Sequence, residues 1–369
     1  PVLSMLRKEQ KASRIRDLNL GNMGFIARFR IRQMLREMRS AFAVVFGMFV
    51  SMLIVMMGLD IYVMCQNVNI ENKADTKFAY MYTYKYPTEK VPEGGEEAFG
   101  KTLKKERLGY NLDVTLLGIH DDNPYFDAKV EDGKNKIIIS TAVAQKYNVS
   151  EGDVFVLNDE ETDTKYAFDI VGIAQYSSSL YIFMDIDSMR ELFHEGSDYY
   201  NIVFSDKALS IPAGRLYATT TKEDVEEASG IFIKMMLPMI YMLLGCSVII
   251  FCVVMYLMMK VMIDRSSFNI SLIKIFGYRT KEIGKLYLRG NFYLVAAGAL
   301  ICIPLAKACM DAIYPMLVAN VCSGMNLTFS WQLYAGIYAA VILLYLFINQ
   351  LLVGRLKKMV PAEVLKNRE

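Results

Sequence analysis

The stretch AFAVVFGMFVSMLIVMMGL, residues 41–59, contains no charged side chain over nineteen positions. A helix of about 20 mainly apolar residues is long enough to cross the hydrocarbon layer of a bilayer. Three more uncharged runs follow along the chain, at Met235–Met259, Gly290–Ala306 and Trp331–Val353. A single such run can be a buried helix of a large soluble core, but four in one chain favour four transmembrane helices.

The composition also favours a membrane protein. Of 369 residues, 54% are hydrophobic and 22% are charged, and the mean hydropathy is +0.25. Soluble domains usually carry fewer apolar residues and more charge. The chain has one Trp and two His, which leaves little material for histidine-based metal or acid–base chemistry. The formal net charge of +2 does not by itself indicate a partner.

The distribution of charge predicts the orientation, because basic residues are retained in short cytosolic loops and flanks. Residues 1–40 hold ten Lys or Arg against three Asp or Glu, residues 260–289 seven against two, and residues 354–369 five against two. Residues 66–234 hold eighteen against thirty, and a segment of this length can be translocated whatever its charge. We therefore expect both termini in the cytosol and residues 66–234 outside.

The predicted fold class is a polytopic α-helical membrane protein with four transmembrane helices and a mixed α+β extracytoplasmic domain between the first and second. The expected order is a cytosolic linker with an amphipathic helix (1–40), a transmembrane helix (41–65), the extracytoplasmic domain with its stalk (66–230), a transmembrane helix (231–259), a cytosolic coupling loop (260–289), a transmembrane helix (290–310), an extracytoplasmic loop (311–330), a transmembrane helix (331–353) and a cytosolic tail (354–369).

The extracytoplasmic segment contains signals for both strands and helices. Short β-branched, aromatic or apolar runs bounded by Gly, Asp and Asn predict strands at Thr76–Tyr86, Val114–Ile119, Lys136–Ser140, Val154–Leu157 and Tyr166–Ile173. Short helices are predicted at Thr141–Tyr147 and Ser188–Phe193, a loop at Pro87–Gly95, and a helical stalk at Lys222–Ser229. About 165 residues are enough for an independent core.

The six cysteines all lie outside residues 66–234, so we expect no disulfide framework in that domain. A bridge between Cys309 and Cys322 is one alternative, and free apolar thiols are favoured over it. Asp60 is expected near the outer end of the first span, at the membrane interface, where a charge costs less than in the hydrocarbon. It would be an intramembrane acid only if the helix continues to Cys65.

The segment GEEAFGKT, Gly95–Thr102, satisfies the phosphate-loop pattern G-x-x-x-x-G-K-[ST]. We reject it as a nucleotide site for three reasons. It follows the loop-like KYPTEKVPEG instead of a buried strand; Glu96 and Glu97 would repel phosphate; and the charge distribution places it outside, away from ATP. No other catalytic motif is present, so we expect no enzyme activity and no cofactor in this chain.

Before the first span, apolar residues recur at helical spacing while arginines fall largely on another face. The apolar set is Ile31, Met34, Leu35, Met38 and Phe42, and the arginines are Arg28, Arg32, Arg36 and Arg39. This pattern is typical of a helix lying on the inner leaflet, with its arginines toward anionic lipid. A solvated helix packed on a protein partner is the alternative.

Four local patterns, together with the order of the spans, resemble the FtsX/MacB-like permeases of ABC transporters. Residues 264–288, DRSSFNISLIKIFGYRTKEIGKLYL, are similar to the cytosolic loop of that family. VPAEVLK, residues 360–366, is similar to its closing tail. In the extracytoplasmic segment, KIIISTAVAQKYNVSEGDVFVL followed by YAFDIVGIAQY resembles a further family element. Residues 6–37, LRKEQKASRIRDLNLGNMGFIARFRIRQMLRE, resemble the linker between two units of ten-span permeases, which implies that this chain is the C-terminal half of one.

The resemblance implies a bacterial permease subunit without a nucleotide site of its own, driven by a separate cytosolic ATPase dimer. The residues implied in ATPase coupling are Arg265, Gly277, Tyr278, Arg279, Lys281, Glu282 and Ile283. A short helix near Thr280–Leu286 would dock on the ATPase, with Gly277 allowing the sharp turn before it. The alternative is that Gly277 only ends a helix and that the basic residues only set the topology.

The implied function is export or extraction of a peptide, lipid or lipoprotein, with mechanotransmission to the extracytoplasmic domain. Expected partners are the ATPase dimer, a second permease unit (a missing N-terminal half or another copy) and membrane lipids, with no nucleic acid. An alternative is a membrane-tethered sensing or binding module that signals, or activates a cell-wall hydrolase, without transport. A sensor normally carries a cytosolic output domain, whereas only short basic segments are expected inside here.

Overall fold

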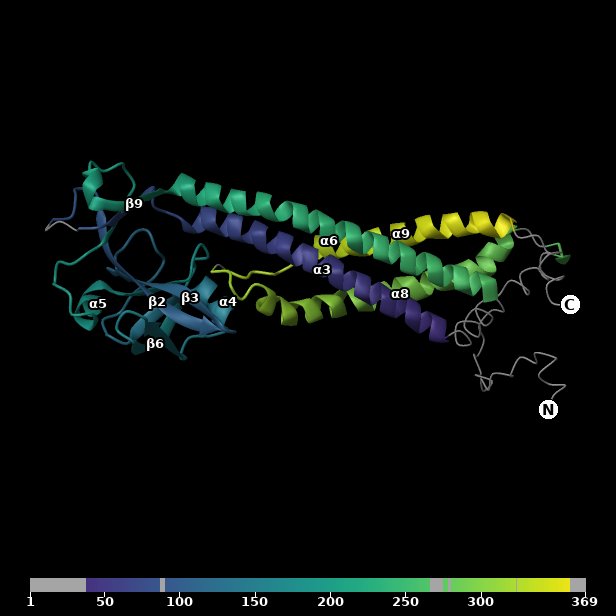
Figure 1. Ribbon diagram of the computed structural model, residues 1–369, viewed down its shortest axis with the longest axis horizontal. Coiled ribbons are helices and arrows are strands. Elements are labelled where there is room, and N and C mark those ends of the chain that lie inside the picture. Colours follow the sequence, from purple (N-terminus) through teal and green to yellow (C-terminus); the bar gives the residue numbers. More distant parts are fainter. Residues whose placement is uncertain (1–37, 87–89, 266–274, 278–279, 323, 359–369) are drawn as a thin grey trace. The chain divides into compact units, whose positions relative to one another are not determined.

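The computed structural model describes residues 38–86, 90–265, 275–277, 280–322 and 324–358 (Figure 1). These form two compact units. The helical unit comprises the chain up to Met56, Leu243–Cys309, and the chain from Ser330 onward. The sheet unit comprises Met57–Met242 and Met310–Phe329. The family-like tail and most of the amphipathic pattern before the first span lie outside the described residues.

The chain has four helices long and apolar enough to cross a membrane, judged by length and composition. They are α3 (Met38–Asp75), α6 (Lys222–Arg265), α8 (Thr280–Leu317) and α9 (Trp331–Lys358). Each is longer than the uncharged run that predicts it, because a charged residue limits a hydrophobic run without ending a helix. The residues expected to form a stalk, Lys222–Ser229, are the first two turns of α6.

Asp60 lies within a helix and is fully buried, because α3 continues for fifteen residues beyond it, to Asp75. The helix thus runs past Cys65, which is the alternative that the sequence left open, and Asp60 does not face water. The continuation keeps an apolar face, with Ile61, Met64 and Cys65 also buried. A buried carboxylate is costly without compensating partners, and Asp60 does take part in an interaction. All six cysteines are free thiols, as expected.

Within the helical unit, two glycines bring helices into close contact. A Cβ atom on Gly47 of α3 would collide with Cγ1 of Val254 on α6. A Cβ on Gly298 of α8 would lie 2.6 Å from Cε of Met48 on α3. Small residues at such crossings are typical of helices that pack tightly within a membrane. Ser51 Oγ also donates a 3.2 Å hydrogen bond to the carbonyl of Ser247.

The sheet unit contains the nine strands between the first and second of these helices. They are β1 (Tyr80–Tyr84), β2 (Glu96–Arg107), β3 (Tyr110–Ile119), β4 (Lys136–Ser140), β5 (Val154–Asp159), β6 (Thr164–Ala174), β7 (Tyr181–Asp185), β8 (Ile202–Ser205) and β9 (Leu216–Thr221). Two short helices, α4 (Thr141–Tyr147) and α5 (Ile186–Leu192), complete the α+β domain. The sequence predicts both helices and the strands β1, β3, β4, β5 and β6 in outline.

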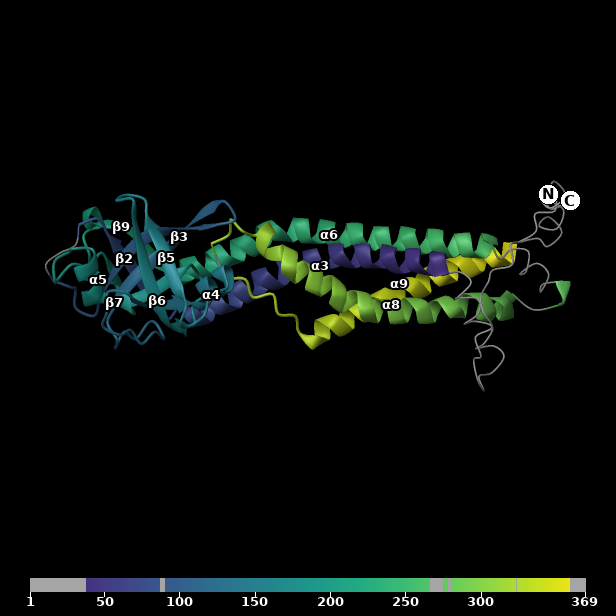
Figure 2. The same ribbon diagram turned by 90° about the horizontal axis from the view of Figure 1, so that it is seen from below.

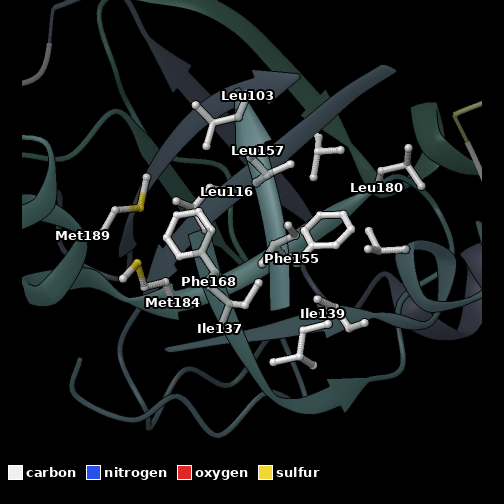
Figure 3. Packing of buried hydrophobic residues seen from close by; sticks show 14 of the residues in the cluster. Leu103, Leu116, Ile137, Ile139, Phe155, Leu157, Phe168, Leu180, Met184 and Met189 are labelled. Carbon is white, nitrogen blue, oxygen red and sulfur yellow. The ribbon is translucent and has the colours of Figure 1, made fainter. Parts of the chain in front are cut away.

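The strand order is β3-β7-β4-β6-β5-β2-β8-β1-β9, and β3 also pairs with β2. The first six strands therefore close into a ring, from which β8, β1 and β9 extend; Figure 2 shows β2, β5 and β6 as neighbours. The ring encloses a core of alternating inward side chains, shown in Figure 3, including Leu103, Phe155 and Phe168. A closed sheet leaves few free edges for unwanted pairing.

Helix α4 is fixed at both ends by its own sequence. The side chain of Ser140 accepts a hydrogen bond from the Val143 amide and caps the N-terminus. Asn148 ends the helix in the left-handed conformation (φ +53°), which Asn tolerates better than most residues, and donates to the carbonyl of Ala144. These caps hold the side chains of Gln145 and Lys146 in defined positions.

Candidate functional site

The structure describes the expected coupling residues only in part. Arg265 is the last residue of α6, and Lys281, Glu282 and Ile283 lie in the first turns of α8. Gly277 has φ +86°, a conformation that L side chains rarely adopt, with no atom near its position for a Cβ. The chain therefore turns sharply three residues before α8, as the glycine suggests. Tyr278 and Arg279 lie outside the described residues.

The phosphate-loop match forms a strand. Gly95–Thr102 continues into β2, whose residues from Phe99 onward pair with β3 in antiparallel register. Backbone amides used in a sheet ladder cannot form the cradle that binds phosphate. Lys101 Nζ lies 3.1 Å from Oδ2 of the buried Asp159 and 4.9 Å from the centre of the Phe193 ring. The lysine that would bind phosphate is thus a structural ion-pair partner.

A cluster of long-range polar contacts in the sheet unit is the strongest candidate for a functional site. We call it the junction. It consists of the α8–α9 connection (318–329), the C-terminal half of α4, the β6–β7 connection (175–180) and the end of α3 (67–75). These segments lie far apart in sequence, and the contacts between them place both the first helix and the chain between the third and fourth helices against the sheet.

Lys146 is at the centre of the junction. Its side chain is fully buried, and Nζ donates a 2.6 Å hydrogen bond to the carbonyl oxygen of Val318. Burial away from water lowers the pKa of Lys146 to about 8, and the nearby positive charge of Arg107 acts in the same direction. A buried lysine of this kind is energetically demanding, so the bond to Val318 is a specific contact and not a loose surface contact.

Backbone contacts continue the junction beyond Val318. The amide of Met325 donates to Oε1 of Gln145 at 2.9 Å, and the amide of Gly324 donates to the carbonyl of Ser177 at 3.4 Å. Consecutive residues of α4, Gln145 and Lys146, therefore bind the α8–α9 connection at its start and near its middle. The connection is held as a fixed strap on the sheet unit.

The same strap is bonded to α3. Nδ2 of Asn67 donates to the carbonyl of Asn326 at 2.9 Å, and Nδ2 of Asn326 donates to Oε1 of Glu71 at 2.8 Å. One turn further, Oδ2 of Asp75 accepts from the amide of Ser177 at 2.9 Å and lies 3.3 Å from Nε2 of Gln175. Helix α3 thus contacts the strap and the β6–β7 connection on successive turns.

The start of α6 is joined to α3 at the same level. Nδ2 of Asn72 donates to Oγ of Ser229 at 2.7 Å, and both side chains are buried. Lys73 and Glu226 form a longer, more exposed ion pair at 3.7 Å. Breaking a buried hydrogen bond leaves an unsatisfied polar group and costs about 1–3 kcal/mol, so the two helices are held in one arrangement here.

The side chains of the junction are suited to holding segments together and not to catalysis. It combines amides, one lysine and carboxylates that are each bonded to a specific neighbour. Among the described residues, no group of three His, Cys, Asp or Glu side chains is arranged to hold a metal ion. What the junction can do is fix the sheet unit to the ends of α3, α6 and α8, so that a displacement of those helices changes its contacts.

The helical unit contains a separate cavity of about 250 Å³ between α3, α6 and α9. Its lining is apolar except for two serines, and includes Met52, Phe251 and Val341. Ser51 and Ser247 in the same wall are bonded, Ser51 to the Ser247 carbonyl and Ser247 to the Leu244 carbonyl. The cavity could therefore hold an apolar chain, because both serine hydroxyls in its wall already donate hydrogen bonds within the protein.

Sequence reasoning missed the junction. Its partners are up to 259 residues apart, as between Asn67 and Asn326, and three of the eight hydrogen bonds described end on backbone carbonyls that carry no sequence signature. The available signals are weak: polar residues at the end of the first long helix, including Asn67, Glu71 and Asn72, and a lysine on the apolar face of a predicted helix.

Comparison with known proteins gives little more. No family model and no curated protein matches the chain. Among solved structures, the chain is similar to the extracellular domain of the "noncanonic ABC-type transporter YknZ" from Gram-positive bacteria. That match covers 36% of this chain and 84% of the other, with a TM-score of 0.24 and 15% identity.

Proposed function

We propose that this chain is the permease subunit of an ABC transporter of the FtsX/MacB-like kind. It couples ATP hydrolysis by a separate cytosolic ATPase dimer to a conformational change of its extracytoplasmic sheet unit, for export or extraction of a peptide, lipid or lipoprotein. The chain lies in the cell membrane of a bacterium, with both termini in the cytosol. It acts beside a second permease unit and itself carries no catalytic site.

The observation that carries this proposal is the junction. A tethered domain that only binds a ligand needs one flexible attachment to its anchor. Here the β6–β7 connection of the sheet is bonded to Asp75 at the end of α3, and α4 is bonded through Lys146 to the connection between α8 and α9. Specific buried hydrogen bonds favour a small number of defined arrangements over a continuum. This is the requirement for transmitting a displacement of helices into a domain.

Two further observations support the proposal. The four long apolar helices provide the spans, with the sheet unit inserted between the first and second. The positive φ of Gly277 supports a tight turn ahead of a short docking helix, where the basic and apolar residues of the expected coupling loop follow. We assign ATPase contact to Tyr278 and Ile283 as apolar anchors, with Arg265, Arg279, Lys281 and Glu282 as a polar rim.

The test compares two substitutions at Gly277. Valine is strained at φ +86° by about 1 kcal/mol or more and would misplace the following helix, whereas asparagine tolerates positive φ. We expect Gly277→Val to reach normal membrane levels but to lose co-purification of an ATP-hydrolysing subunit. Gly277→Asn should retain both the subunit and vanadate-sensitive ATP hydrolysis in the purified complex.

Gly336 provides a matched control. It lies within α9, has no positive φ, and no atom lies near its position for a Cβ. Gly336→Val should leave association and hydrolysis unchanged. Wild-type chain that spans the membrane but recovers no ATP-hydrolysing subunit would contradict the permease proposal and favour a sensing module. Undiminished association in Gly277→Val would move the coupling contact to another part of the chain.

A further inference from the structure

We propose that the tip of the β2–β3 hairpin rests on the outer surface of the lipid bilayer. The contact is made by the side chains of Leu108 and Tyr110, with Val154 and Val156 beside them; we call these four residues the hairpin patch. The inference rests on the proposed function, because it requires α8 and α9 to span the membrane and the sheet unit to lie outside.

The turn itself is costly, which sets it apart from the other connections of the sheet unit. Arg107 pairs with Tyr110, so Leu108 and Gly109 form a two-residue turn, with φ values of +49° and +83°. Two-residue turns of this kind favour Asn, Asp or Gly at the first position. A leucine there is strained, and with 56% of its surface exposed it gains little from packing in return.

The hairpin patch is apolar beyond the turn. Tyr110 is 51% exposed, and Val154 on the neighbouring strand β5 is 60% exposed. Lys104 is paired with Asn158, and continuing that antiparallel register places Val156 beside Glu106 and Val154 beside Leu108. Lys105 Nζ donates to the carbonyl of Val156 at 2.7 Å, which confirms that these strands stay adjacent near the tip.

The position of the tip identifies its partner. The guanidinium of Arg107 lies 5.7 Å from the centre of the Tyr147 ring, and the hydroxyl of Tyr147 donates to the carbonyl of Lys105 at 3.4 Å. Tyr147 directly follows Lys146, which is bonded to Val318. Val318 is the first residue after α8, where that helix leaves the candidate span. The hairpin tip and the chain that leaves the α8 candidate span therefore both contact the last turn of α4.

The chemistry of the tip suits a bilayer surface. Aliphatic and tyrosine side chains flanked by basic residues are the combination that partitions into the headgroup region, where the apolar part is buried and the charge meets anionic lipid. Lys105 and Arg107 flank the exposed Glu106 at the base of the tip and also contact Phe155 and Tyr147, so the apolar side chains of the hairpin patch supply most of the attraction to the bilayer. A protein partner at the tip is the competing occupant, and the experiment below distinguishes it.

The test uses the full chain reconstituted in vesicles of phosphatidylcholine and phosphatidylglycerol. In a variant lacking the native cysteines, single cysteines replace Leu108, Tyr110, Ser197 or Trp331 and carry an environment-sensitive fluorophore. Quenching is measured with phosphatidylcholine that has a doxyl group near its headgroup. Trp331, an exposed side chain at the first residue of α9, reports whether that span enters the bilayer.

Ser197 is the matched control on the sheet unit. It is exposed and lies between Phe193 and Tyr199, which both pack on Phe99. Phe99 precedes Arg107 by eight residues on β2, or about 25 Å along the strand. A label at Ser197 should therefore remain in water wherever the hairpin tip lies.

We expect the labels at Leu108 and Tyr110 to be quenched about threefold or more beyond the label at Ser197, and to approach the label at Trp331. Quenching at Trp331 with Leu108 and Tyr110 no different from Ser197 would overturn this inference and leave the proposed function standing. If the two hairpin labels are instead shielded from both the doxyl lipid and a water-soluble quencher, a protein covers the tip and the inference is wrong. An unquenched label at Trp331 would overturn both proposals.

Discussion

Lys146 of α4 donates a hydrogen bond of 2.6 Å from Nζ to the carbonyl oxygen of Val318, 172 residues further along the chain. The lysine is fully buried, so it joins the sheet unit to the chain after α8 through a contact that water does not screen. Its neighbour Gln145 accepts from the amide of Met325, which fixes the same connection at a second point. These two contacts make α4 the element that ties the end of the third long helix to the sheet.

The first prediction concerns the pH dependence of this contact. Because burial lowers the pKa of Lys146 to about 8 from an ordinary value of 10.5, the unfolded chain binds more protons between these values. The free energy of unfolding therefore rises with pH in that window, by about 1 kcal/mol between pH 7 and pH 9. Thermal unfolding in detergent should show this rise in the wild type and lose it in Lys146→Met.

Lys165 provides the control, because it is an exposed lysine on β6 of the same unit. Lys165→Met should retain the wild-type rise in stability between pH 7 and pH 9. An identical pH dependence in wild type and Lys146→Met would show that Lys146 is charged and solvated, in contradiction to the buried bond.

The second prediction concerns Asn326 in the strap. Asn326→Ala removes the 2.8 Å bond to Oε1 of Glu71, whose other oxygen is buried without a hydrogen-bond partner. The loss should cost about 1 kcal/mol, or a few degrees in the unfolding midpoint. Asn111→Ala removes an exposed bond of 3.4 Å to Glu160 and should change the midpoint by much less. Equal changes in the unfolding midpoint of the two variants would show that the Asn326 bond does not stabilise the junction.

The third prediction concerns Lys101 of the phosphate-loop match. Lys101→Ala leaves the buried Asp159 without its ion pair and should lower stability by about 1–3 kcal/mol. ATP hydrolysis by the assembled complex should stay within about twofold of wild type, or roughly 0.4 kcal/mol in barrier. A hundredfold loss of hydrolysis with unchanged stability would mean that the segment binds nucleotide.

The pH dependence of the same pair has the opposite sign. Burial alone would raise the pKa of Asp159, but the hydrogen bond and the charge of Lys101, together with hydrogen bonds from the Glu161 amide and Thr162, outweigh it and lower the pKa below its ordinary value. The stability that this carboxylate contributes is present above an unfolded pKa of about 3.9 and is lost as the pH falls through its folded value. Lys101→Ala should therefore reduce the acid sensitivity of unfolding below pH 4.

The fourth prediction concerns topology. Ser150 is exposed in the turn after α4, and Ser271 lies in the basic loop between the second and third spans. Single cysteines at these positions, without the native cysteines, should react oppositely with an impermeant thiol reagent in intact cells. Labelling at position 150 and not at 271 is expected. The reverse pattern would invert the orientation that the charge distribution predicts.

The local elements of the fold could be predicted where sequence periodicity and burial agree. The run KIIIS predicts β4, and Ser140 then caps α4, so the boundaries of both are found to the residue. Strand β2 was missed because charged side chains alternate with Phe99 and Leu103 along it, and the pattern resembles a surface loop. Strand β9, LYATTT, was missed because it has few apolar residues to bury.

Features of the candidate sites could be predicted only where the backbone conformation of a single residue determines them. The turn at Gly277 could be predicted, because a glycine between an apolar and a basic segment suggests a backbone with positive φ, and the structure has φ +86° there. The bond between Lys146 and Val318 depends on a tertiary contact and on a backbone acceptor that any residue would supply. No local pattern in the chain encodes such a pair.

The central claim is that a cytosolic ATPase acts on the sheet unit through the junction. The most direct test is hydrogen–deuterium exchange of the ATPase-bound chain in lipid, with and without ATP and vanadate. The account predicts that nucleotide trapping changes exchange in residues 67–75, 141–149 and 318–329, in wild type and Gly277→Asn but not in Gly277→Val. Exchange that changes only within residues 260–289, with the three junction segments unaltered in wild type, would contradict it.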